Sequence, residues 1–77
     1  MSDYENILIS AVRYALGRMT YIVELTVNYV LQEIEDNKLS DRCLSVIRED
    51  IANAEDYGME CDKKDWIKLL NKIKEVI

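Results

Sequence analysis

Fifteen carboxylates and two thiols are the candidate metal ligands and the main candidate acids, bases and nucleophiles of this chain, which has no histidine among its 77 residues. Without histidine, the most common general base and the most common metal ligand of proteins are missing. The sequence has no glycine-rich phosphate loop and no serine or cysteine in a nucleophile-elbow motif. Its carboxylates fall on helix faces expected to be exposed, where no dry environment perturbs their pKa values. The residues therefore predict a protein without catalytic activity.

The two cysteines, Cys43 and Cys61, are the residues that suggest a metal site. With Asp41, Glu60 or Asp62 they offer thiolates and carboxylates to zinc, provided that they meet at one end of the fold. Antiparallel helices argue against such a meeting, and the paired-cysteine spacing of zinc sites is missing. The alternative is two reduced thiols, with Cys43 a small buried residue, and no cofactor is expected.

Carboxylates are concentrated between residues 49 and 62, which makes this stripe a candidate surface for a basic partner. Residues 1–62 carry a net charge of −8 and residues 63–77 a net charge of +3. On a helix, carboxylates at these spacings imitate successive phosphates presented to a cationic groove. The alternative is a solvated face that keeps the protein soluble, and an acidic body argues against direct nucleic-acid binding. The candidate partner-binding acids are Glu49, Asp50, Glu55, Asp56, Glu60 and Asp62.

The stretch of residues 13–23 supplies a second candidate surface. Gly17, one of two glycines in a chain without proline, predicts a turn between two apolar periodic segments. Arg13 and Arg18 flank this turn and are candidate partner-binding residues, because arginine and tyrosine dominate interface hot spots. Alternatively, these arginines pair with local acids such as Glu24. The aromatic residues are expected to be core or half-buried: Tyr14, Tyr21, Tyr29 and Trp66.

Four amphipathic helices are expected to position these residues, because apolar residues recur at intervals of three and four along the chain. Gly17 and Gly58 stand where left-handed residues end the first and third helices. Asp62 is expected to cap the last helix, with Asp65 in a shortened reciprocal capping arrangement. The expected helices run from Ser2 or Asp3 to about Leu16, over about residues 19–36 with Thr20 as the cap, from Ser40 to near Tyr57, and from Asp62 to Val76.

The segment of residues 19–30 is ambiguous between helix and strand. Val23, Leu25, Val27 and Tyr29 alternate with polar residues, and the segment is rich in β-branched side chains, which favours a strand. Helical spacing nevertheless continues through residues 32–35, and no other stretch alternates to pair with such a strand. A lone strand leaves its backbone groups unpaired, so we predict a helix.

These elements predict a single all-α domain over residues 1–77, a small bundle of about four amphipathic helices joined by short turns. The sequence has no apolar run near the ~20 residues that span a bilayer and no cleavable leader, so a cytoplasmic location and no membrane partner are expected. Domains this small without disulfides often gain stability by dimerisation, which makes a homodimer an open alternative.

Three segments, residues 15–23 (ALGRMTYIV), 47–51 (IREDI) and 58–70 (GMECDKKDWIKLL), resemble small accessory proteins encoded by phages and prophages of Gram-positive bacteria. Some members of that pool are anti-CRISPR proteins directed at the type II effector Cas9. The resemblance therefore implies a stoichiometric inhibitor that binds protein, performs no chemistry and acts in the bacterial cytoplasm. An acidic body suits a binder of the positively charged channel in which Cas9 holds its heteroduplex.

The leading hypothesis is thus an anti-CRISPR-like protein that binds a host CRISPR effector, Cas9, or another basic-surfaced nucleic-acid-binding protein, and blocks engagement of target DNA. One alternative is a homodimeric structural or regulatory phage module that uses the Gly17 turn and its arginines for contacts. A further alternative is a metal-stabilised module that uses Cys43 and Cys61.

Overall fold

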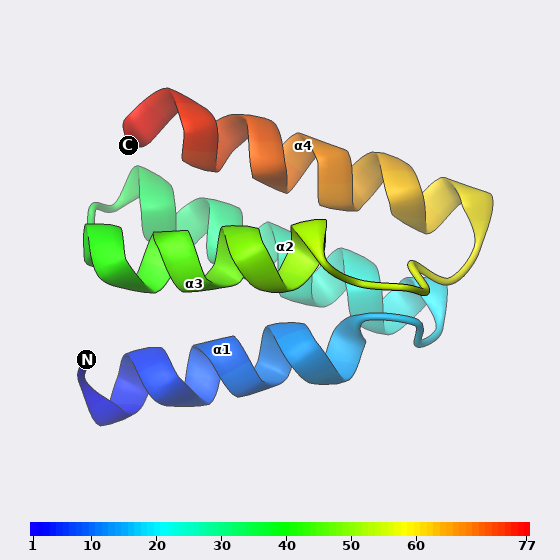
Figure 1. Cartoon of the computed structure of the whole chain (residues 1–77), viewed down its shortest axis with the longest axis horizontal. Helices are drawn as coiled ribbons and strands as arrows, with labels where there is room; N and C mark the ends of the chain where they lie inside the picture. Colours follow the sequence, from blue (N-terminus) through cyan, green and yellow to red (C-terminus); the bar gives the residue numbers. More distant parts are fainter.

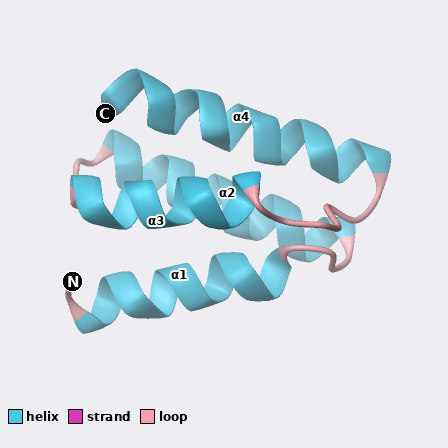
Figure 2. Ribbon diagram, viewed as in Figure 1, coloured by secondary structure: helices cyan, strands magenta, loops and turns pink.

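The chain folds into four helices and no strands, as the computed structural model of residues 1–77 shows (Figures 1 and 2). The helices are α1 (Asp3–Ala15), α2 (Thr20–Glu35), α3 (Asp41–Ala52) and α4 (Glu60–Val76). Consecutive helices run in opposite directions, so that α1 and α3 are parallel neighbours, as are α2 and α4. The pairs α1–α4 and α2–α3 lie on the diagonals of the bundle. The predicted all-α bundle is confirmed.

The core of the bundle consists of sixteen buried apolar residues from all four helices and the α2–α3 turn. Trp66 is its largest fully buried side chain. Burial of one Val, Leu or Ile side chain stabilises a fold by about 1.5–3 kcal/mol, so the inner stripes supply most of the driving force. The core residues are Leu8, Ile9, Val12, Ala15, Val23, Val27, Val30, Ile34, Leu39, Cys43, Leu44, Ile47, Ile51, Trp66, Leu69 and Ile73.

The segment that alternates like a strand is helical, and the prediction of a helix over residues 19–36 is confirmed. Val23, Val27, Val30 and Ile34 are buried at helical spacing along one side of α2. The N-cap residue is Met19 and not Thr20, and it makes no side-chain capping hydrogen bond. Burial of this apolar stripe outweighs the β-propensity of the individual residues.

The carboxylate of Glu5 joins the beginnings of α1 and α3. Its Oε2 accepts hydrogen bonds from the backbone N–H (2.9 Å) and the hydroxyl (2.7 Å) of Ser40, the N-cap residue of α3. Its Oε1 accepts hydrogen bonds from the backbone N–H and the hydroxyl of Ser2, the N-cap residue of α1, both at 3.2 Å. These hydrogen bonds, with those from Ser40 dominant, favour the ionised form and lower the pKa of Glu5 to about 2.

The third helix is shorter than predicted, because α3 ends at Ala52 and not near Tyr57. Residues 53–59 form a loop over the end of α3. Tyr57 lies half-buried in this loop and donates a hydrogen bond from its hydroxyl to the carbonyl oxygen of Ile51 (2.8 Å). The half-buried Tyr57 side chain packs against the core beside the end of α3.

The start of α4 also differs from the prediction. The N-cap residue is Met59, and Asp62 is the third residue inside the helix. The carboxylate of Asp62 accepts a hydrogen bond from the backbone N–H of Met59 (3.0 Å), so it caps the helix from within. Asp65 therefore has no reciprocal capping role. The expected left-handed conformations of Gly17 (φ 78°) and Gly58 (φ 87°) are confirmed.

Acidification is expected to remove the contribution of Glu5 to stability. Its pKa is about 2 in the folded protein against an ordinary value of 4.5, so the carboxylate stabilises the fold above pH 4.5, and this contribution is lost as the pH falls toward 2. Glu5→Gln should therefore unfold at lower urea concentration than the wild type at pH 7, and the difference should shrink toward pH 2. Glu24→Gln, at an exposed residue without a hydrogen bond, is the control. A difference that persists undiminished at pH 2 contradicts this account.

Replacing Gly58 by alanine is expected to destabilise the fold more than replacing Gly17. A Cβ at Gly58 would lie 2.7 Å from Oδ2 of the buried Asp62, whereas a Cβ at Gly17 would meet the exposed carboxylate of Asp56 at 3.3 Å. Both substitutions carry the left-handed backbone cost of about 1–2 kcal/mol, and Gly58→Ala adds the overpacking cost, for about 3 kcal/mol in total. Urea unfolding measures both. An equal loss of unfolding free energy in the two variants would show that the Asp62 side chain moves away from the new Cβ without an energetic cost.

Candidate functional site

The α1–α2 turn and the α3–α4 loop lie against each other at the end of the bundle opposite to the chain termini (Figure 1). A Cβ at Gly58 would lie 3.2 Å from the carbonyl oxygen of Arg18, and the Thr20 hydroxyl lies 3.5 Å from the Cys61 sulfur. We call this region, residues 16–20 and 53–61, the turn end. It brings together residues 16–20 and 58–61, which are far apart in the sequence.

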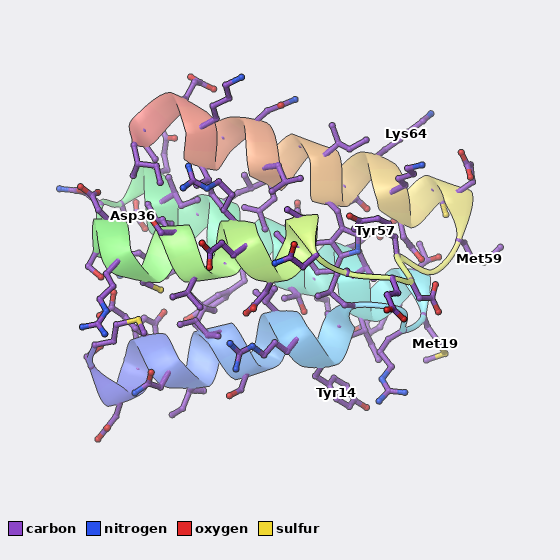
Figure 3. The ribbon with its side chains drawn as sticks, viewed as in Figure 1. Tyr14, Met19, Asp36, Tyr57, Met59 and Lys64 are labelled. Atoms are coloured by element: carbon purple, nitrogen blue, oxygen red, sulfur yellow. The ribbon has the colours of Figure 1, made fainter.

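Two methionines project from the turn end (Figure 3). Met19 and Met59, the N-cap residues of α2 and α4, are 68% and 67% exposed. Exposed methionine is costly in water but adapts its shape to an apolar partner. Sequence reasoning missed both residues. Their position one or two residues after a glycine and directly before a helix, where a polar cap is usual, is the signal that could have identified them.

Three of the predicted acids surround this end of the bundle. Glu55, Asp56 and Glu60 are exposed, and none of them forms an ion pair. Asp56 accepts a hydrogen bond from the backbone N–H of Gly58 (2.8 Å), which holds the loop in its turn. Glu49 is exposed farther back, on α3. The turn end therefore combines apolar side chains with a rim of unneutralised negative charge.

The remaining predicted acids contact other parts of the fold, so the expected acidic helix face is wrong. At the surface, Arg13 Nε donates a hydrogen bond to Oδ2 of Asp50 (2.7 Å), and this ion pair links α1 to α3 and raises the pKa of Arg13. Asp62 is fully buried beneath the loop. The stripe also breaks because α3 ends at Ala52, which leaves the acids beyond it on a loop and on α4. Arg13 and Asp50 thus join two helices, and Asp62 is the one predicted acid that is enclosed by the fold.

Arg18 lies back along α1 and not over the acidic rim. Its guanidinium carbon is 4.8 Å from the centre of the Tyr14 ring, and its Nε donates a hydrogen bond to the carbonyl oxygen of Tyr14 (3.2 Å). Of the expected pairings of the arginines with acids, Arg13 makes one, with Asp50 and not with Glu24, whereas Arg18 makes none. Arg18 makes no ion pair within the chain, so its charge is free for a partner.

The two cysteines lie at opposite ends of the bundle, because they belong to the first turns of the antiparallel helices α3 and α4. Cys43 is fully buried beside Glu5, and burial raises the pKa of its thiol to about 11. Cys61 is exposed. No three or more cysteine, aspartate or glutamate side chains are placed to hold a metal ion. The zinc hypothesis is therefore contradicted by the geometry.

A second surface follows the groove between α1 and α2. The groove has a volume of about 220 Å³ and is lined by Tyr4, Ile7, Leu8, Ala11, Thr26 and Tyr29. The Tyr4 and Tyr29 hydroxyls are 2.6 Å apart across it, and this hydrogen bond, together with burial and the nearby Glu33 carboxylate, raises the pKa of Tyr4. Here too the prediction of core or half-buried tyrosines is wrong, because Tyr14, Tyr21 and Tyr29 are all exposed, and only Trp66 is buried as expected.

No protein-family model, no curated protein and no solved structure matches the chain. The resemblance of three segments to phage accessory proteins therefore stays a prediction. None of the four helices combines the length and the apolar character that a membrane-spanning segment requires.

The two thiols are expected to differ in reactivity by orders of magnitude. Cys61 is exposed, whereas Cys43 is buried and has a thiol pKa of about 11, about two units above its ordinary value, so its thiolate fraction is roughly 100-fold lower. Titration with a chromogenic disulfide should release one equivalent of thiol from the native protein and a second only in denaturant. Cys61→Ser should abolish the fast equivalent, and a fast reaction that survives this substitution would contradict the assignment.

Proposed function

We propose that this chain is a non-catalytic protein that binds and blocks a basic, nucleic-acid-binding protein, with the CRISPR effector Cas9 as the specific partner. The observation that carries the proposal is the turn end, where exposed Met19 and Met59 lie among carboxylates that no basic residue of the chain neutralises. The site of action is the cytoplasm of the bacterial host.

The composition of the turn end supports binding to protein. Protein interfaces combine an apolar centre, which supplies most of the binding energy, with a polar rim that selects the partner. Methionine is enriched in such centres, and the acids Glu55, Asp56 and Glu60 provide a rim that is mainly negative, with Arg18 as the one basic residue of the turn end. A partner that is complementary to this surface presents an apolar patch bordered by lysine or arginine.

The charge of the chain supports a partner that normally holds nucleic acid. Residues 1–62 have a net charge of −8, and this field favours encounter with a basic surface and disfavours the phosphate backbone itself. A protein bound to the basic channel of Cas9 would exclude the target strand without any chemical step. An acidic surface that only keeps the protein soluble would carry the same charge. The exposed methionines favour a binding surface over that alternative, and a functional assay tests it.

The proposal is tested with guide-loaded Cas9 from several Gram-positive hosts, by titrating the protein into a target-DNA cleavage reaction and into a gel shift of target DNA. The wild-type protein should abolish both DNA binding and cleavage near one equivalent. The double substitution Glu55→Lys with Glu60→Lys should raise the half-inhibitory concentration by about tenfold or more, because two rim charges change sign. Met59→Ser should weaken inhibition as well.

The matched control is the double substitution Asp36→Lys with Glu75→Lys, which changes the net charge equally at exposed positions away from the turn end. This variant should inhibit within about twofold of the wild type, since steering by net charge alone is a small effect on affinity. If both double variants weaken inhibition equally, the net charge of the protein and not the turn end determines binding. An absence of inhibition with every effector would refute the Cas9 assignment.

A further inference from the structure

The outer side of α1 and α2 carries a second apolar stripe that the fold leaves uncovered. Its residues on α1 recur at intervals of three and four, as in the buried stripe, but lie beside that stripe on the exposed surface of the helix. The large members are 42% to 68% exposed. We call this surface the α1–α2 face: Tyr4, Ile7, Ala11, Tyr14, Leu25 and Tyr29.

The α1–α2 face contains no Asp, Glu, Lys or Arg, in a chain whose net charge is −5. The Glu33 carboxylate that interacts with Tyr4 is buried, and Arg18 lies over the Tyr14 ring. Two copies of an acidic protein repel each other over most of their surfaces, so they can meet at low electrostatic cost on a face that exposes no carboxylate. We propose that the α1–α2 face binds a second copy of this chain, with α1 packed antiparallel to α1 of the other copy around a two-fold axis.

The order of residues along α1 fits this arrangement. In a two-fold interface the same patch meets itself in reverse, so residues equally distant from the axis face each other. With the axis between Ser10 and Ala11, Ile7 faces Tyr14 of the other copy. The small Ala11 side chain at the crossing lets the two helix backbones approach closely. Apolar residues therefore meet apolar residues along the whole contact.

The ends of the stripe are complementary in charge. Asp3 begins α1, and Arg18 lies just beyond its end, at nearly equal distances from Ala11 along the chain. The antiparallel arrangement brings Arg18 of one copy to Tyr4 and Asp3 of the other. Arg18 has no acidic partner within its own chain. The arrangement provides one, together with a second aromatic ring for the guanidinium.

The size of the face suits a small dimer. With 150–250 Å² for a complete aromatic side chain, the exposed fractions of Tyr4, Tyr14 and Tyr29 alone correspond to about 300 Å² of accessible surface. A standard interface buries about 800 Å² on each partner, of which the apolar centre is a part. Ile7 and Leu25, each more than half exposed, extend this centre. A chain of 77 residues is also short enough to gain stability from such a contact.

The α1–α2 face lies along the side of the bundle, whereas the turn end lies at its tip, so this inference does not rest on the function proposed above. Dimerisation through the face leaves Met19, Met59 and the acidic rim of both copies accessible.

The test is sedimentation equilibrium of the full chain at micromolar concentrations, at low and at high salt. We expect twice the 9.0 kDa of one chain, with an association that persists at high salt because the contact is mostly apolar. Ala11→Glu places a charge beside the two-fold axis, close to the same charge of the other copy, and should weaken association by at least 100-fold. Asn6→Glu places the same charge on the exposed other side of α1 and should leave association unchanged within about threefold.

A second measurement tests the antiparallel arrangement. Asp3→Arg and Arg18→Asp should each weaken the dimer, and the double variant should recover most of the loss, because the exchanged charges pair again across the interface. Circular dichroism confirms that each variant is folded. A wild-type chain that is monomeric near 100 μM would overturn the proposal. So would equal effects of Ala11→Glu and Asn6→Glu, or dissociation at high salt, which would indicate contacts between α4 lysines and the acids.

Discussion

The bundle depends on the ionised carboxylate of Glu5. Because α1 and α3 are parallel neighbours, their N-termini lie side by side, and both present unpaired backbone N–H groups and a partial positive charge. These like partial charges disfavour the arrangement unless an anion lies between them. Glu5 is that anion, since it binds the capping serines of both helices at once. At the other end of the same helix pair, the contact between Arg13 and Asp50 fixes the relative position of α1 and α3.

The helices were predictable because the buried stripe repeats at three and four residues in each of them, and Ser2, Ser40, Gly17 and Gly58 mark several of their ends. The site was less predictable, because a carboxylate has the same sequence signature whether it is solvated or buried. Asp62 was placed on the surface and is instead enclosed by its own loop. Likewise, the apolar residues of α1 in the α1–α2 face have the same spacing as its buried residues. Only the packing of α1 against α2 and α3 decides which of the two stripes is buried.

The fifteen carboxylates serve different purposes in this fold. Glu5, Asp50 and Asp62 hold helix ends and neighbouring helices in place, and their carboxylates accept hydrogen bonds from other groups of the chain. Glu55 and Glu60 have no such contacts and project into solvent at the turn end. The protein thus presents a charged surface at the turn end and an uncharged, apolar surface on the α1–α2 face. This separation allows one small domain to offer chemically distinct surfaces without interference between them.

Because the number of helices is even and consecutive helices are antiparallel, the two chain termini lie at the same end of the bundle. Both chain termini lie at the Glu5 end, away from the turn end (Figure 1). An affinity tag, a fluorophore or a neighbouring domain joined to either terminus therefore leaves the tip unobstructed. When the chain is anchored by a terminus on a sensor surface, the methionines point outward into the solution. The four helices thus separate any attachment at the termini from the loops of the turn end by the length of the bundle.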